Sequence, residues 1–292
     1  ILSLKMMKSK SYHLWEGDNL EDKKISTGAK IGYFFLALVP FISYWIIQLG
    51  VTIAFMLPRI SEVMNALQNG NTEKYTEIVS EISPPATFVM HVAMALIFGL
   101  WYFFGRTKNP ERQFRFRPKI LLVTFVMALS LSVLSNTTAL IQKCFFPDVV
   151  ADYERLVEMS GMGKSFIMLL SASFLAPISE ELLCRGITLM YFRKSLPFWI
   201  ANTIQALIFG IMHMNWVQGT YAFIIGLILG YAVKKYNSII PSMMIHFFVN
   251  TVASYITAVM FMFIPASIPM VIVMAIVSLM AVIPSFIFMK ND

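Results

Sequence analysis

Two acidic residues stand inside a long apolar stretch of the chain. Glu180 and Glu181 are adjacent, and Arg185 is the only other charged residue in the segment 166–192. An ionised group at mid-membrane costs at least ~2.5 kcal/mol on insertion scales, so it needs a partner or a use. Glu181 and Arg185 are four residues apart and share one face of a helix, which predicts an ion pair. Glu180 sits about 100° further around the helix and has no partner nearby in sequence.

Two histidines in other apolar segments are candidate partners for Glu180. His213 lies near the end of one segment, and His246 lies within another. Asn250 follows His246 by four residues, so both side chains point the same way from a helix. A membrane histidine taken alone is more often an interhelical hydrogen-bonding group than a catalyst. An unpaired glutamate in the same chain favours a functional site instead.

The remaining candidates carry less chemistry. His13 lies in the N-terminal segment and is expected to be solvated. His91 begins an apolar run beside no acid, so we expect it to pack or to hydrogen-bond. Ser171 and Ser173 precede the glutamate pair, but no GxSxG or similar motif frames either as a nucleophile.

A glutamate with two histidines can support hydrolysis in two ways. The carboxylate can act as a general base on a water, while donors stabilise the oxyanion that forms. Alternatively, Glu180, His213 and His246 can ligate a zinc ion, as in some catalytic zinc sites. The sequence does not decide between a divalent metal and no cofactor.

These residues resemble the CPBP family, also called Abi or CAAX amino-terminal protease-like, whose membrane endopeptidases include the type II CAAX-processing enzymes. The resemblance covers about residues 166–255. Three family motifs occur in the expected order on separate apolar segments: Glu180, Glu181 and Arg185 for EExxxR, Phe209 and His213 for FxxxH, and His246 and Asn250 for HxxxN.

The resemblance implies a role for each matched position. Glu180 would be the general base on a water, and His213 would orient or activate that water. His246 and Asn250 would stabilise the oxyanion of the tetrahedral intermediate. The structural support would come from Glu181, Arg185 and Phe209.

Composition indicates which elements must position these groups. The 292 residues are 58% hydrophobic and only 13% charged, whereas soluble domains are about 25% charged. An all-α bundle of about eight transmembrane spans is therefore predicted, since about 20 apolar residues cross a bilayer. The expected spans are 31–57, 86–104, 119–141, 166–192, 196–214, 219–234, 238–262 and 268–289.

The lysines and arginines test this list of spans. Most of the 23 fall in alternate connecting segments, chiefly 1–30 and 105–119, while acidic residues gather in the others. This distribution places both termini in the cytoplasm by the positive-inside rule. The formal net charge of +7 therefore reflects membrane topology and does not indicate a nucleic-acid partner.

The pattern of apolar spans and charged connections divides the chain into segments and indicates no second, soluble domain. Stretches 59–83 and 146–165 are expected to form short helices on the outer surface. Gly226 and Gly230 form a GxxxG, which marks either a close-packing face or chance in an apolar helix. The expected segments are 1–30 cytoplasmic, 31–141 with spans one to three, 142–165 extracytoplasmic, 166–262 the CPBP-like core, and 263–292 the last span and tail.

The depth of each residue along its span is a weaker test of whether the three groups meet. At ~1.5 Å per residue, Glu180 lies about 20 Å from the cytoplasmic end of its span, His246 about 12 Å and His213 about 25 Å. A tilt, a kink near Pro177 or a shifted span boundary must bring the three groups together.

The leading hypothesis is an intramembrane endopeptidase in a bacterial plasma membrane, cleaving a membrane-associated peptide or protein. Prenylated substrates are one class that the resemblance implies, and peptide processing or bacteriocin immunity are others. A non-enzymatic immunity or scaffold protein that binds a peptide or partner in the same cavity is the alternative. A transporter or proton relay would also use a buried carboxylate with histidines, but no inverted repeat supports it. The substrate, the side of its entry and the oligomeric state cannot be read from the sequence.

Overall fold

The computed structural model describes residues 25–105, 116–162, 164–253, 255, 259 and 262–292, and every regular element in these ranges is helical. His13 and the basic residues of 1–24 and 106–115 lie outside them. The elements are α1 (Thr27–Leu36), α2 (Val39–Met56), η1 (Leu57–Arg59), α3 (Ile60–Gln68), α4 (Thr72–Gly105), α5 (Pro118–Phe145), α6 (Pro147–Met159), α7 (Phe166–Leu170), η2 (Ser171–Leu175), α8 (Ala176–Glu181), η3 (Leu182–Thr188), α9 (Leu189–Phe192), α10 (Phe198–Met212), α11 (Trp216–Tyr236), α12 (Ile240–Phe248), η4 (Val249–Ala253) and α14 (Ile268–Asn291).

The helices confirm an all-α polytopic bundle. Six helical stretches in the described residues are long and apolar enough to cross a bilayer: Thr27–Gln68, Thr72–Gly105, Pro118–Phe145, Phe166–Phe192, Trp216–Tyr236 and Ile268–Asn291. The fifth expected span contains a helix of only 15 residues, α10. The seventh begins with α12 and η4 and continues into residues outside the described ranges. The count of eight therefore stays a prediction.

Helix α4 differs from the expected boundary. The span expected to begin at residue 86 is part of a helix of 34 residues that begins at Thr72 and continues through Pro84 and Pro85. Each proline removes one N–H donor from the helix. Pro84 is buried, and a Cβ on Gly161 would lie 3.1 Å from its Cγ. Packing against the loop after α6 thus helps α4 to stay helical here. Of the expected surface stretch 59–83, only α3 forms a separate helix, whereas α6 matches the expected helix in 146–165.

Helices α10 and α11 pack through small residues. A Cβ on Gly226 would lie 3.0 Å from the Cβ of Ala206, and a Cβ on Gly230 would overlap Oδ1 of Asn202. Only glycine allows the two backbones to approach so closely. The close-packing interpretation of the GxxxG pair is therefore confirmed.

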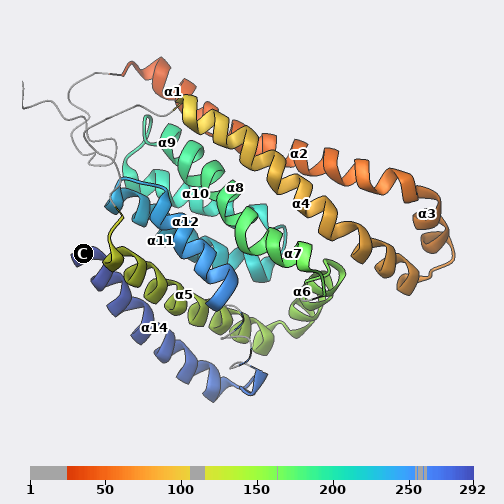
Figure 1. Ribbon diagram of the computed structural model, residues 1–292. Helices are drawn as coiled ribbons and strands as arrows, with labels where there is room; N and C mark the ends of the chain where they lie inside the picture. The colour runs from red at the N-terminus through yellow and green to blue at the C-terminus, as the bar shows by residue number, and fades with distance from the viewer. Residues whose placement is uncertain (1–24, 106–115, 163, 254, 256–258, 260–261) are drawn as a thin grey trace, which may run out of the picture.

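The bundle has two main apolar clusters of buried residues. One joins α2, α4, η3, α9 and α10, and the other joins α5, α11, α12 and α14. In Figure 1, α2 and α4 lie on one side, α5 and α14 lie on the other, and the helices from α7 to α12 run between them. The glutamate-bearing helix belongs to the first cluster through η3 and α9, and it also contacts α12 of the second cluster.

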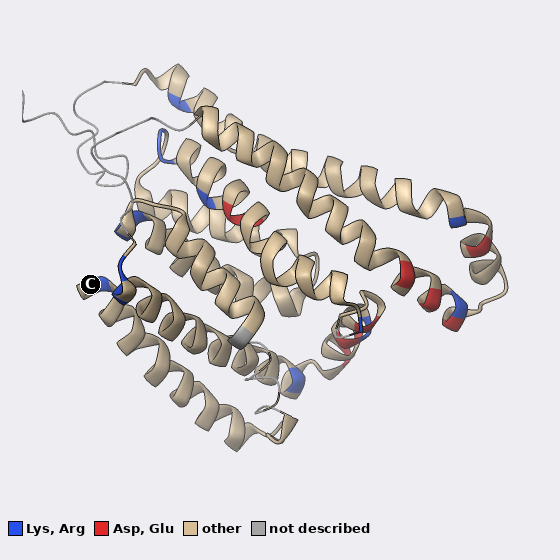
Figure 2. Cartoon of the chain, in the orientation of Figure 1, with Lys and Arg blue, Asp and Glu red and all other residues tan. Residues whose placement is uncertain are grey.

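Charged residues divide between the two ends of the bundle. Figure 2 shows acidic residues on α3, on the start of α4 and on α6, and mostly basic residues at the opposite end. One further group of both signs lies midway, within the helix that contains α8 and η3. Charged residues are expected at the two ends of the bundle, where the helices meet water. The central charged group marks the candidate site.

Candidate active site

The helix that carries the glutamates contains two wide turns. Phe166–Phe192 runs as α7, η2, α8, η3 and α9, and both η2 and η3 are π-helical. A π-helical turn closes i→i+5 hydrogen bonds, which reorients the residues beyond it and often occurs at functional sites. The depths estimated from the sequence assumed a regular α-helical rise. The two π-helical turns therefore shift the side chains from the estimated positions.

Glu181 and Arg185 form the expected ion pair. Arg185 Nη1 donates to Glu181 Oε1 at 2.7 Å, and both side chains are fully buried. Arg185 Nη2 also donates to the carbonyl of Gly226 at 3.2 Å, and the guanidinium lies 4.3 Å from the ring centre of Phe209. The arginine therefore fixes the glutamate-bearing helix against both α10 and α11.

His246 lies between the two glutamates. Its Nδ1 is 3.0 Å from Glu181 Oε1, and its Nε2 is 3.7 Å from Glu180 Oε2. Because a carboxylate can only accept, Nδ1 carries the hydrogen. Glu181 thus orients the imidazole so that Nε2 faces Glu180.

Glu180 is the more accessible of the two carboxylates. Its side chain is 14% exposed, whereas that of Glu181 is fully buried. Glu180 had no partner nearby in its own helix, and the structure supplies His246 from α12. The separation of 3.7 Å exceeds a direct hydrogen bond.

The ring of Phe209 lies between His213 and His246 and contacts both. Phe209 lies with its ring centre 5.1 Å from that of His213 and 5.6 Å from that of His246. His213 Nδ1 is 2.8 Å from the carbonyl oxygen of Phe209, so Nδ1 donates and Nε2 is the free acceptor. Phe209 therefore sets the position of both histidines.

Asn250 bonds to the backbone rather than to the other motif residues. Its Nδ2 donates to the carbonyl of Ala172 at 3.0 Å. Ala172 belongs to η2 and Asn250 to η4, so this bond joins two π-helical segments. The amide retains a second N–H for the expected role at the oxyanion.

Two neighbours of the site were not identified from sequence. His91 of α4 is buried, and its Nδ1 is 2.8 Å from Oγ of Ser179, the residue before Glu180. Tyr44 of α2 is also buried and lies close enough to Glu180 to interact electrostatically. His91 hydrogen-bonds as expected, but its contact beside the glutamates was not foreseen, because nothing in sequence links these helices.

The three possible zinc ligands do not gather into a metal-binding group among the described residues. Within the part of the chain that is described, no three His, Cys, Asp or Glu side chains are arranged to hold a metal ion. His246 directs one ring nitrogen to each glutamate, while His213 lies beyond Phe209. Glu180, His213 and His246 therefore do not fit a zinc site in this arrangement.

Comparison with known families agrees with the motifs. Residues 162–252 match the model described as type II CAAX prenyl endopeptidase Rce1-like. Comparisons with curated proteins and with solved structures give no match. The matched range contains both glutamates, Arg185, both site histidines and Asn250. Together with the apolar helices, the match indicates an integral membrane protein with similarity to a family of proteases. Residues 162–252 are thus similar to the Rce1-like type II CAAX prenyl endopeptidase family, and the match does not extend over the rest of the chain.

Proposed function

We propose that this protein is an intramembrane endopeptidase that uses Glu180 to activate a water. The observation that carries the proposal is the pair of contacts made by His246. One ring nitrogen is held by the buried Glu181, and the other faces Glu180 at 3.7 Å. The second carboxylate thus holds the histidine, which leaves Glu180 to act on water. Peptides with a prenylated CAAX end are the proposed substrate class, since the matching family is described by that activity.

The proposed reaction begins with Glu180 taking a proton from water as the water oxygen attacks the peptide carbonyl carbon. His246 donates from Nε2, as the imidazolium, to the oxyanion that develops. The carboxylate of Glu181 stabilises the positive charge on that ring. When the C–N bond breaks, the proton held by Glu180 passes to the leaving amine. His213, with Nε2 as a free acceptor, orients the water, and the second N–H of Asn250 supports the oxyanion.

The test uses purified full-length protein with a prenylated CAAX peptide and a quenched, lipid-anchored peptide library. Glu180→Gln keeps the size of the side chain but removes the base, so kcat should fall by about 10²–10⁴-fold. Thermal unfolding of both proteins in the same detergent establishes that the variant is folded. Bound metal is quantified in both samples.

The outcomes separate the hypotheses. Cleavage by the wild type without stoichiometric metal supports the Glu–His mechanism. Stoichiometric metal in an active sample would require the site to rearrange and would overturn the metal-free steps. If the folded Glu180→Gln variant cleaves as fast as the wild type, Glu180 is not the base. If neither protein cleaves any peptide, a non-enzymatic binding or immunity role replaces the proposal.

A further inference from the structure

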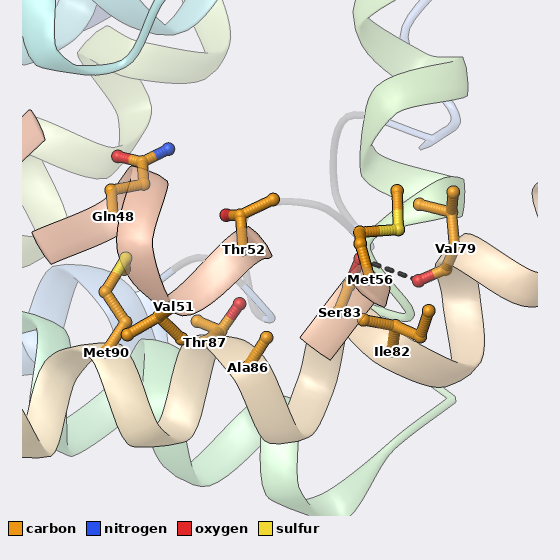
Figure 3. Close-up of a pocket in the computed structure, with 10 residues that line it drawn as sticks. All are labelled: Gln48, Val51, Thr52, Met56, Val79, Ile82, Ser83, Ala86, Thr87 and Met90. Atoms are coloured by element: carbon orange, nitrogen blue, oxygen red, sulfur yellow. Dashed lines mark hydrogen bonds between the residues drawn. The ribbon is translucent and has the colours of Figure 1, made fainter. Parts of the chain in front are cut away.

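A cavity of about 190 Å³ lies between α2 and α4. Figure 3 shows its lining, which is contributed by Gln48, Val51, Thr52, Met56, Val79, Ile82, Ser83, Ala86, Thr87 and Met90. It is separate from the contacts among the glutamates and histidines, none of which lines it.

Four of the lining side chains are polar: Gln48, Thr52, Ser83 and Thr87. Oε1 of Gln48 is buried and has no hydrogen-bond partner. Ser83 donates to the carbonyl of Val79, and its lone pairs remain available. Polar groups on a transmembrane seam are costly unless they meet a partner, so this lining suits a ligand with its own donors and acceptors.

The cavity adjoins the site along both helices. On α2, Tyr44 lies one turn before Gln48 and interacts with the charge of Glu180. On α4, Met90 lines the cavity, and the next residue, His91, contacts Ser179 beside Glu180. The cavity and the site thus share both helices, with Tyr44 and His91 next to residues of the lining.

We propose that this cavity binds the extended peptide backbone of the substrate next to the bond to be cleaved. An extended peptide in a bilayer presents N–H and C=O groups that need partners, and the four polar side chains supply them. A prenyl or acyl chain would use the apolar lining alone and would leave these groups unpaired. This inference rests on the proposed function for its substrate, but it concerns binding and not the chemical step.

The first test maps contacts by photo-crosslinking to the full-length Glu180→Gln protein, which would bind the substrate without consuming it. The probe is a prenylated CAAX peptide with benzoylphenylalanine on either side of the cysteine, and a matched probe carries benzophenone on the prenyl chain. Trypsin cleavage after Lys30, Arg59, Lys74 and Arg106 would release all ten lining residues in two fragments, 31–59 and 75–106. The peptide probe should label both fragments, and the prenyl probe should label neither.

The second test compares neighbouring positions on α2. Thr52→Trp adds bulk at a residue that lines the cavity, whereas Ile53→Trp adds the same side chain at a neighbouring residue that does not line it. Both positions are exposed, so the two variants differ in the cavity and not in exposure. Thr52→Trp should lower kcat/KM by about tenfold or more, chiefly through KM, as expected when one or two contacts are lost. Ile53→Trp should leave kcat/KM within about twofold.

Failure of this inference is distinct from failure of the proposed function. Cleavage that depends on Glu180, with no peptide label in either fragment, would overturn the cavity as a peptide site and leave the catalytic proposal standing. Labelling by the prenyl probe alone would replace the peptide with an apolar chain. Labelling by the peptide probe in a protein that cleaves nothing would support the cavity while the catalytic proposal falls.

Discussion

Polar residues lie at two helix–helix interfaces, or seams, of the bundle. Their hydrogen bonding differs between the two seams. At the α10–α11 seam, Asn202 donates to the carbonyl of Leu227 and accepts from Gln205, and glycines bring the backbones together. At the α2–α4 seam, Gln48 projects towards a cavity and its Oε1 has no partner. The first seam uses polarity chiefly to hold helices, although Oε1 of Gln205 is also buried without a partner, and at the second seam the unpaired group lines a cavity.

The same contrast separates the two adjacent glutamates. Glu181 accepts from Arg185 and His246 and is fully buried, so its charge is compensated within the protein. Glu180 lies 3.7 Å from Nε2 of His246 and retains some exposure. Glu181, which Arg185 and His246 hold, is therefore expected to matter for stability, although its Oε2 has no hydrogen-bond partner. Glu180, which is more exposed, is expected to matter for activity.

The largest effect on stability is expected at Arg185. Arg185→Met leaves Glu181 as an uncompensated buried charge, which should lower the free energy of unfolding by about 3–5 kcal/mol. Reversible unfolding in SDS mixed micelles measures this change. The double variant Glu181→Gln/Arg185→Met removes both charges and should recover most of the loss. A single variant as stable as the wild type would show that the pair does not hold the helix.

A smaller effect is expected from adding one methyl group at the α10–α11 seam, with an exposed position on α2 as the control. Gly230→Ala places a Cβ against Asn202 and should cost about 1–3 kcal/mol by overpacking. Gly50→Ala on α2 meets nothing within 4 Å, so it should gain about 0.5–1 kcal/mol from helix propensity. Unfolding of both variants under the same conditions checks the signs. Equal changes at the two positions would show that close packing at Gly230 does not contribute to stability.

Sequence reasoning succeeded where the contacts are local. The four-residue spacing of Glu181 and Arg185 fixes a shared helix face, so their ion pair could be predicted. The contact of Glu180 with His246 was suggested by chemistry, but the depth count could not place the two together because it assumed regular helices. The π-helical turns at η2 and η3 depend on packing that no short motif reveals. The position of His91 beside Ser179 likewise depends on how α4 packs, and nothing near His91 in sequence indicates it.

The smallest effect is expected when a polar side chain is truncated at each seam. Asn202→Ala removes the bond to Leu227 and the acceptor for Gln205 in a fully buried position, and should cost about 1–3 kcal/mol. In Gln48→Ala, Oε1 has no hydrogen bond to lose, and the substitution enlarges an existing cavity. The free energy of unfolding should therefore change by less than about 0.5 kcal/mol. Unfolding curves give the stabilities, and cleavage of the prenylated peptide by the same samples gives KM. For Gln48→Ala, a raised KM at unchanged stability would confirm that the α2–α4 seam keeps its polarity for the substrate, whereas a large loss of stability at unchanged KM would make Gln48 a packing residue like Asn202.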